Sequence, residues 1–307
     1  MAQITVSDVL TRIQRGKSLR KAELSGIDLN GACLDRGNFS AAYLRRTTLR
    51  NASCRRANLS QATLILADLS GSCLEGSQLN NAVFTQARLE KANLQRIQGK
   101  AALFRGTKLD DIDASFARFE QADFQEASGP QARFKYAALT KARFDKANFS
   151  QSSFEGAQLK RSHWQQATLL GTSFAMADLA QSNLDEAVLV GASLSETNGL
   201  SASLQQADLT AATLHAAQLD WSDFWYAVLT RADLRGASLY GASLEFANLS
   251  GANLKGADLR EANLENAQLE GVCLEYCQVK GALFTEATGL LPEQKQWLKR
   301  HGALNVA

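Results

Sequence analysis

Residues 247–264 read ANLSGANLKGADLREANL and show most clearly the repeat that determines the architecture of this chain. It repeats every five residues, in the order of a small residue, a polar residue, leucine and two polar or glycine residues. The same phase runs from Leu19 to Phe284 without a slip, over 54 consecutive central positions. Leucine fills 35 of these positions and phenylalanine 12, while alanine fills 37 of the 54 positions two residues earlier. One regularity therefore governs almost the whole sequence.

A period of five matches neither ordinary secondary structure, because a helix repeats every 3.6 residues and a strand every two. Each unit must therefore contain one change of direction. Four corners close a square coil of 20 residues, and successive coils pair through their backbones at about 4.8 Å per coil. The central Leu or Phe and the small residue two positions before it point inward, and the other three residues point outward. Such coils bury their apolar side chains only by stacking on one another.

The spacing of the aromatic central residues supports a coil of 20 residues. Two runs have members 20 apart and predict two stacks on opposite walls, namely Phe84, Phe104, Phe124, Phe144 and Trp164 in one and Phe134, Phe154 and Phe174 in the other. The first run spans three central positions without a large side chain, Gly99, Ala114 and Gly129. We expect those three units to be irregular corners rather than inserted loops.

The pattern A-[DN]-[LF]-x-x resembles the repeat of the pentapeptide-repeat family. Clean copies stand at residues 67–69, 92–94, 122–124 and 147–149, in addition to the opening stretch. The resemblance covers most of the chain and is specific for the fold. It implies an all-β fold, a right-handed quadrilateral β-helix of about 13 coils, since 54 units divide into fours. The right hand comes from the family and not from the spacing.

The N-terminal end of the repeat carries the pattern of a short amphipathic helix. Thr5 with Asp8 three residues later forms a capping box, and apolar residues recur at helical spacing until Gly16. We therefore predict a helix over residues 6–15. An open coil end leaves backbone groups unpaired, so this helix is expected to cap the first coil.

The C-terminal end carries a second helix pattern after the repeat stops at Gly289. Pro292 can open a helix, which continues over residues 294–301 and ends before Gly302. An apolar cluster would pack on the last coil, with a dimer contact as the alternative: Leu290, Leu291, Trp297 and Leu298. The predicted division of the chain is residues 1–16 as the N-terminal capping helix, 17–288 as the repeat domain and 289–307 as the C-terminal helix and tail.

The composition favours a cytoplasmic protein. No apolar run is long enough to span a bilayer, and the N-terminus has no charged-then-apolar leader. Cys33 and Cys73 lie two coils apart in the repeat frame, which is too far for a disulfide. Cys54 occupies a buried central position. The cysteines therefore indicate reduced thiols, as in the cytosol.

The sequence offers no candidate for catalysis. The three histidines, His163, His215 and His301, lie far apart in the frame and at outward positions or in the tail. Cys273 and Cys277 have a spacing of four, unlike the two-residue gap of common zinc sites. No phosphate-binding glycine loop or nucleophile motif is present. We therefore predict a protein that is not an enzyme, with no cofactor, no metal and no catalytic residue.

Two regions of the outer surface depart from the background. The first is aromatic, and large rings at outward positions commonly mark contact surfaces, although these rings could also shield one another. The candidate partner-binding residues are Trp221, Trp225, Tyr226, Tyr240 and Phe246. A smaller pair, Phe116 and Tyr136, also shares a column.

The second region is basic. Residues 1–60 carry 11 Lys or Arg against four acids, whereas the rest of the chain carries 22 against 27. This excess indicates either a solvated surface or an acidic partner. Nucleic acid is disfavoured, because Tyr43 is the only aromatic residue close to the arginines in the sequence frame. The candidate electrostatic patch consists of Arg36, Arg45, Arg46, Arg50, Arg55 and Arg56.

These observations favour a non-enzymatic scaffold that binds another protein along its side, with homodimerisation as an option and no membrane association. The resemblance implies a second function, mimicry of duplex DNA to modulate DNA gyrase or topoisomerase. Relatives with that activity are strongly acidic on the DNA-like face, whereas this chain has a net charge of +2. A third function, as an accessory or effector protein of bacterial type VI secretion, rests on resemblance alone.

Overall fold

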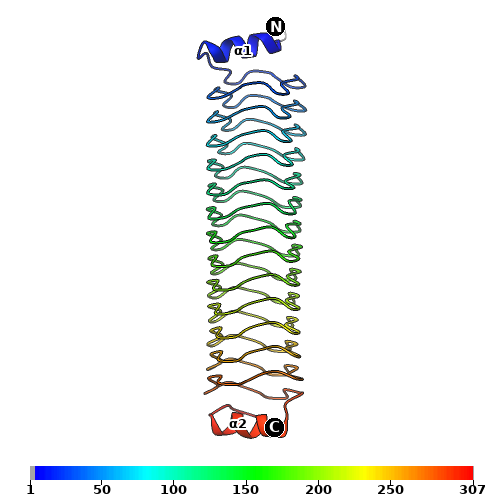
Figure 1. Ribbon diagram of the computed structural model, residues 1–307, viewed down its shortest axis with the longest axis vertical. Helices are drawn as coiled ribbons and strands as arrows, with labels where there is room; N and C mark the ends of the chain where they lie inside the picture. The colour runs from blue at the N-terminus through cyan, green and yellow to red at the C-terminus, as the bar shows by residue number, and fades with distance from the viewer. Residues whose placement is uncertain (1–3, 307) are drawn as a thin grey trace. The chain divides into compact units, whose positions relative to one another are not determined.

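The computed structural model describes residues 4–306 and divides into two compact units, Met1–Ala157 and Gln158–Ala307. Each unit consists of stacked coils (Figure 1), in which one residue of every five pairs with the residue 20 positions later in a parallel bridge. Glu23 pairs with Tyr43 in the first unit, and Asp178 pairs with Asn198 in the second. The predicted coil of 20 residues is confirmed in both units.

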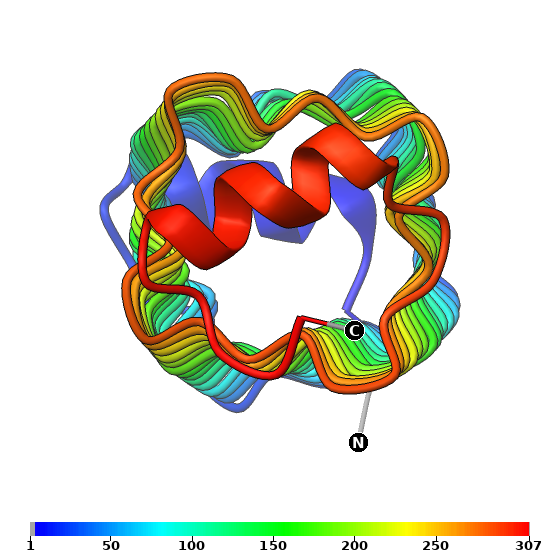
Figure 2. The same cartoon turned by 90° about the horizontal axis from the view of Figure 1, so that it is seen from below.

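The backbone pairing is sparser than ordinary strands would give. Each bridge involves a single residue, and no strand of two or more paired residues forms within residues 4–306. The cause is the corner after every bridge, where the second turn residue takes a left-handed conformation, as in Lys21 at φ 57°. Figure 2, a view along the coils, shows that each coil has four sides. The β-helix thus pairs coil to coil through isolated bridges rather than through continuous strands.

The core follows the five-residue repeat. The central Leu and Phe side chains and the Ala two residues before them are buried in both units. Phe104 stacks on Phe84 and on Phe124, each with a ring-centroid distance of 4.9 Å. On the opposite wall Phe134 stacks on Phe154 at 4.9 Å, and Phe124 meets Phe134 edge to face at 5.8 Å. The stacks predicted for these residues of the first unit are confirmed.

The small central residues do not interrupt the coil, so the expectation of irregular corners was wrong. Gly99, Ala114 and Gly129 follow the same pattern of turn and bridge as their neighbours. A side-chain carbon on Gly99 would come within 2.8 Å of the Phe119 ring, and one on Gly129 would collide with the Phe149 ring. These two phenylalanines lie one coil further on and fill the volume that each glycine leaves.

Helix α1, Val6–Gln14, stands at the N-terminal end of the first unit (Figure 1). The predicted capping box is present, because the Asp8 backbone N–H donates to the Thr5 hydroxyl and the Thr5 N–H donates to the Asp8 carboxylate. Val9 is fully buried. The helix ends one residue earlier than predicted, and Lys17 already donates its N–H to the Arg12 carbonyl as the chain enters the coil.

Helix α2, Pro292–Arg300, lies across the end of the last coils of the second unit (Figure 2). Leu298 is fully buried, but Leu291 is exposed, contrary to the prediction that both pack on the coil. The reason is that Leu291 is the residue before the helix and has an extended backbone, with its N–H bound to the Gln294 side chain. After α2 the chain returns to the coil, where Leu304 pairs with Leu283 in one more parallel bridge.

Truncating a stacked ring tests the core. We expect Phe124→Ala to lower the free energy of unfolding by about 3–5 kcal/mol, because it leaves a cavity between two coils. Phe116→Ala removes a half-exposed ring from a corner of the same unit and serves as the matched control. Urea unfolding followed by circular dichroism measures both, and equal effects of the two variants would contradict the stacked core.

A buried hydroxyl provides a second test with the opposite sign. The Ser77 hydroxyl is buried at a position where alanine is usual, and it has no hydrogen-bond partner among the described residues. We expect Ser77→Ala to raise the free energy of unfolding by about 1 kcal/mol, because the unpaired hydroxyl costs desolvation energy. Ser152→Ala is the control and should destabilise, since the Ser152 hydroxyl donates to the Gly129 carbonyl at 2.8 Å. A destabilised Ser77→Ala variant would contradict the assignment.

Candidate interaction surfaces

The histidines do not gather into a site. His163 and His215 are exposed on the second unit. His301 follows α2, where its Nδ1 lies 2.8 Å from the Trp297 carbonyl oxygen. Within residues 4–306 no three His, Cys, Asp or Glu side chains are placed to hold a metal ion together.

The cysteines differ in their exposure. Cys33 is exposed, whereas Cys54 and Cys277 are buried. Burial raises the pKa of Cys54 to about 12 and the pKa of Cys277 to about 12. The Cys277 thiol donates to the Leu254 carbonyl at 2.9 Å. These two thiols therefore stay protonated at neutral pH and lack the thiolate that reactivity requires.

The predicted aromatic residues occupy two neighbouring corners of the second unit. One corner contains residues 220–221 and, one coil further, 240–241. The next corner contains residues 225–226 and 245–246. The two corners border one side of the coils, which we call the aromatic wall. The structure therefore brings all five predicted aromatic residues to the edges of a single wall.

At the first corner the rings are held by neighbours. Trp221 meets Tyr240 edge to face with ring centroids 5.3 Å apart. The Trp221 ring also lies over Gly241, where a side-chain carbon would come within 2.5 Å of it. The Arg260 guanidinium lies 5.7 Å from the Tyr240 ring centroid and donates to the Asp258 carboxylate, which lowers the pKa of Asp258. This corner therefore presents ordered rings.

At the second corner three rings form one cluster. Tyr226 and Phe246 stack at 4.7 Å with almost parallel planes, and Trp225 meets Tyr226 edge to face at 4.4 Å. The contacts leave much of the rings open to solvent, with 57% of Trp221, 48% of Tyr226 and 37% of Phe246 exposed. The rings shield one another only in part.

The middle of the aromatic wall is polar. Asp223 pairs through its backbone with Ser203 on one side and with Ser243 on the other. Its carboxylate accepts hydrogen bonds from the Gln205 side chain at 2.6 Å and from the Trp225 N–H at 3.0 Å. The aromatic wall thus has aromatic side chains along its two edges and small polar groups between them.

The predicted basic patch is only partly assembled in the first unit. Arg45 and Arg46 occupy the corner diagonally opposite to Arg55 and Arg56 in a four-sided coil. Arg50 stands at a third corner, where its Nε donates to the Asp68 carboxylate at 2.5 Å. The arginines that do come together line a hollow of about 300 Å³, whose lining residues are Asp35, Arg36, Arg55, Arg56, Glu75, Gly76 and Arg96.

Two exposed residues were missed by the sequence reasoning. Arg96 joins the hollow although it lies 40 residues after Arg56, and the 20-residue frame carries the signal for it. Tyr276 is 78% exposed, the largest value for a large apolar side chain within residues 4–306, and Lys255 lies 5.3 Å from its ring centroid. Tyr276 lies at a corner outside the aromatic wall.

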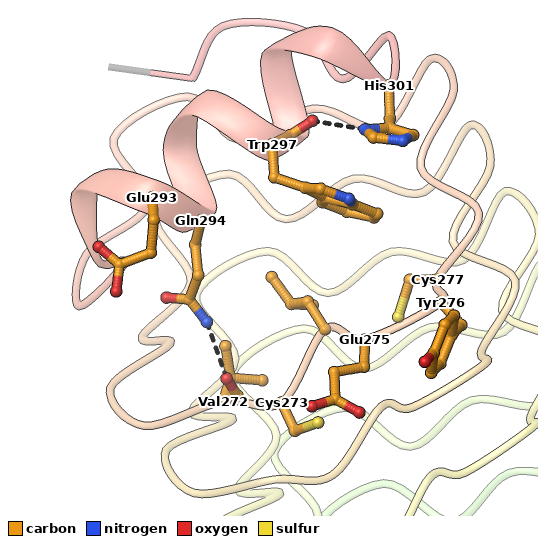
Figure 3. Close-up of a pocket in the computed structure, with 10 residues that line it drawn as sticks. Val272, Cys273, Glu275, Tyr276, Cys277, Glu293, Gln294, Trp297 and His301 are labelled. Atoms are coloured by element: carbon orange, nitrogen blue, oxygen red, sulfur yellow. Dashed lines mark hydrogen bonds between the residues drawn. The ribbon is translucent and has the colours of Figure 1, made fainter.

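A cavity of about 860 Å³ lies between α2 and the last coil (Figure 3). Trp297 and His301 lie on the helix side with their rings stacked at 4.2 Å. The coil side is formed by residues 272–277, and the Gln294 side chain donates to the Val272 carbonyl at 2.9 Å.

Neither helix within residues 4–306 has the length and hydrophobicity needed to cross a membrane.

Comparison with known proteins identifies the repeat. A family model described as pentapeptide repeats (8 copies) matches residues 38–76, 64–97, 77–113, 115–151, 131–166, 152–189, 177–215, 212–245 and 247–285. These matches cover most of the chain. No curated protein matches the sequence.

Several solved structures resemble the chain. HetL, a pentapeptide repeat protein involved in heterocyst differentiation regulation in the cyanobacterium Nostoc sp. strain PCC 7120, is 27% identical over 94% of this chain and 99% of its own, with a TM-score of 0.32. The pentapeptide repeat protein alr5209 from Nostoc PCC 7120 is 33% identical over 33% of this chain and 83% of its own, with a TM-score of 0.29. Full-length QnrB1, a plasmid-mediated fluoroquinolone resistance protein, is 16% identical over 71% of this chain and 95% of its own, with a TM-score of 0.28.

The burial of the thiols predicts their reactivity. Raising the pH from 8 to 10 should leave Cys54 and Cys277 unmodified by iodoacetamide, because both folded pKa values, about 12, lie above this range. The exposed Cys33 should react at once. Mass spectrometry after digestion measures each site, and unfolding in urea should make all five cysteines reactive. Modification of Cys54 in the folded protein at pH 8 would contradict its burial.

Proposed function

The chain belongs to the pentapeptide-repeat family, and we propose that it is a non-enzymatic scaffold that binds another protein on the outer side of its coils. The aromatic wall of the second unit is the proposed contact surface. Each coil there is filled by Leu, Phe and Ala side chains, so the wall is a fixed surface and not the lining of a cleft. A fixed surface loses little conformational entropy on binding, which favours affinity.

The aromatic wall has the composition of a binding surface. Tyr and Trp are the residues that most often dominate the energy of protein interfaces, and single soluble proteins seldom expose several such rings side by side. The wall exposes two Trp together with Tyr226 and Phe246. The Asp223 carboxylate in the middle can accept a hydrogen bond from a partner. This combination of an apolar edge and a polar centre is the observation that carries the proposal.

The backbone at the corners adds a second argument. Trp221, Tyr226 and Phe246 all have left-handed φ values, between 53° and 58°. This conformation costs an L-residue roughly 1–2 kcal/mol, and glycine avoids the cost. The corners of the coil therefore do not require bulky rings. The same left-handed φ recurs at corner residues of every kind, such as Gln206 and Ala216, so the backbone itself does not call for the rings.

The ends of the units complete the proposal. We assign α1 and α2 the role of caps on a right-handed β-helix, which would cover unpaired backbone groups at the coil ends. The buried Val9 of α1 and Leu298 of α2 support this role, as does the Leu304 bridge to Leu283. The free thiols support a reducing compartment such as the cytosol.

Mimicry of duplex DNA has less support. A DNA-like face needs rows of carboxylates, and the net charge of the chain is +2. The hollow in the first unit gathers four arginines with only two acids. A gyrase supercoiling assay with micromolar protein distinguishes the alternatives, since the scaffold proposal predicts no effect on the enzyme.

Removal of the aromatic wall tests the scaffold proposal. We expect the triple variant Trp221→Ala, Trp225→Ala, Tyr226→Ala to keep its circular dichroism spectrum and to lose at least about 2 kcal/mol of binding energy for its partner, as hot-spot residues do. Partners are captured from lysate on immobilised protein, identified by quantitative mass spectrometry and then titrated in purified form by calorimetry.

The matched control is the double variant Met176→Ala, Tyr276→Ala. It removes exposed apolar side chains from a different corner of the same unit and should bind like the wild type. Light scattering after gel filtration records whether the partner is a second copy of the chain. If the triple variant and the wild type share the same partners, affinities and oligomeric state, the aromatic wall is not the contact surface.

A further inference from the structure

One corner of the first unit carries a column of outward positions, all but one of which hold a large side chain. It is formed by the left-handed corner residues that lie 20 apart, and we call it the arginine corner: Arg36, Arg56, Gly76, Arg96, Phe116 and Tyr136. Successive members lie about 4.8 Å apart, because backbone pairing sets the coil spacing. The column therefore presents cationic groups that are followed directly by aromatic rings.

Gly76 creates the hollow in this column. It occupies the corner position where its neighbours one coil away carry Arg56 and Arg96. A side-chain carbon on Gly76 would lie 3.6 Å from Cγ of Arg56, so the Arg56 stem borders the gap. The resulting space of about 300 Å³ is open to solvent and lies between Arg56 and Arg96, whose backbones are two coils, or about 10 Å, apart.

The charges around the hollow are not balanced. Asp35 is engaged within the protein, where it accepts hydrogen bonds from the Ser53 hydroxyl at 2.6 Å and the Arg55 N–H at 2.8 Å. Glu75 lies 3.9 Å from Arg55 and 3.6 Å from Arg96. Arg36 and Arg56 form no ion pair within 4.0 Å with any residue of the described range 4–306. Positive charge is therefore available to a ligand.

The aromatic rings beyond Arg96 offer their edges and not their faces. The Arg96 guanidinium lies 5.8 Å from the Phe116 ring centroid, and Phe116 stacks on Tyr136 at 5.5 Å. The far face of Tyr136 lies against Gly156, where a side-chain carbon would come within 2.5 Å. Each ring face is thus occupied, while about half of each side chain is exposed. Nucleic-acid bases need a free ring face for stacking, so this corner does not suit them.

We propose that the arginine corner is a binding site for an acidic peptide segment of another protein, in which carboxylates are followed by an apolar side chain. The carboxylates would bind Arg56, which has no ion pair within residues 4–306, and would compete with Glu75 for Arg96 on the other side of the hollow, since the planar guanidinium pairs well with carboxylate oxygens. The apolar side chain would pack on the edges of Phe116 and Tyr136. An inorganic anion would use only the first half of this site.

The length of the site fits an extended peptide. An extended chain advances about 3.3 Å per residue, so a stretch of four residues spans the roughly 10 Å between the backbones of Arg56 and Arg96. Two or three more residues reach Phe116 one coil further on. This site lies in the first unit and does not involve the aromatic wall. If the peptide does not bind here, the proposed function of the aromatic wall is unaffected. If the aromatic wall binds no partner, the proposal for this site is equally unaffected.

Fluorescence anisotropy with the full chain tests the proposal. The probe is a fluorescein-labelled peptide of sequence Asp-Glu-Asp-Glu-Gly-Phe-Leu, in low salt. We expect Arg56→Glu to weaken binding about tenfold or more, whereas Arg46→Glu, with the same charge change at the opposite corner, should change affinity less than about twofold. Gly76→Gln should also weaken binding by filling the hollow. Glutamine occupies the equivalent corner position at Gln61 and Gln86, so the fold accepts it.

Further variants and probes in the same experiment distinguish an acidic peptide from other classes of ligand. Gly106→Gln places the same side chain at the equivalent position of another corner and should bind like the wild type. Phe116→Ala should weaken the binding of the full peptide but should not change the binding of a peptide that has Gly in place of Phe and Leu. The proposal is overturned if the wild type does not bind the peptide, if Arg46→Glu and Arg56→Glu behave alike, or if a labelled oligothymidine binds at this corner more tightly than the peptide. Circular dichroism verifies that each variant folds. If Arg56→Glu does not fold, the affinity of Gly76→Gln for the peptide decides whether the hollow is the binding site.

Discussion

Parallel backbone pairing between residues 20 apart is the constraint on which both units depend. Because the pairing repeats in every coil, each side chain has a neighbour directly before and after it at the coil spacing. A residue type that recurs at intervals of 20 therefore becomes a column. Inside the first unit this produces the stack of Phe84, Phe104 and Phe124. Outside, it produces the arginine corner and, in the second unit, the stacked pair Tyr226 and Phe246.

The architecture could be read from the sequence because its cause is local and periodic. One apolar residue in five predicts the corners, and the spacing of the phenylalanines predicts the coil. The capping box of Thr5 and Asp8 lies within four residues and was equally visible. The glycines at 99 and 129 were misjudged because a ring from the next coil fills each gap, and a volume shared between coils has no signature in one unit. The exposed Leu291 depends on how the chain enters α2, which periodicity does not describe.

The candidate surfaces were predictable only where the frame of 20 residues was applied. The frame placed Tyr226 and Phe246 in one column, as observed. The same frame placed Arg36 beside Arg56, but the basic patch also joined Arg45 to Arg55, which stand at opposite corners, and omitted Arg96. The pairing of Arg50 with Asp68 joins neighbouring coils and depends on side-chain reach. The position of a residue in the 20-residue frame thus predicts the corner at which it lies. Its ion pairs and the exposure of its side chain require the packed structure.

The register of 20 residues is the claim on which the core, the aromatic wall and the arginine corner all rest. Pulsed electron paramagnetic resonance tests this register within the first unit by measuring the distance between spin labels on Arg46→Cys and Glu126→Cys. Cys33, Cys73 and Cys273 are first replaced by serine. These two positions share a corner and lie four coils apart, so the account predicts one narrow distance of about 19 Å. A broad distribution, or a distance longer than about 30 Å, would contradict a paired coil of 20 residues.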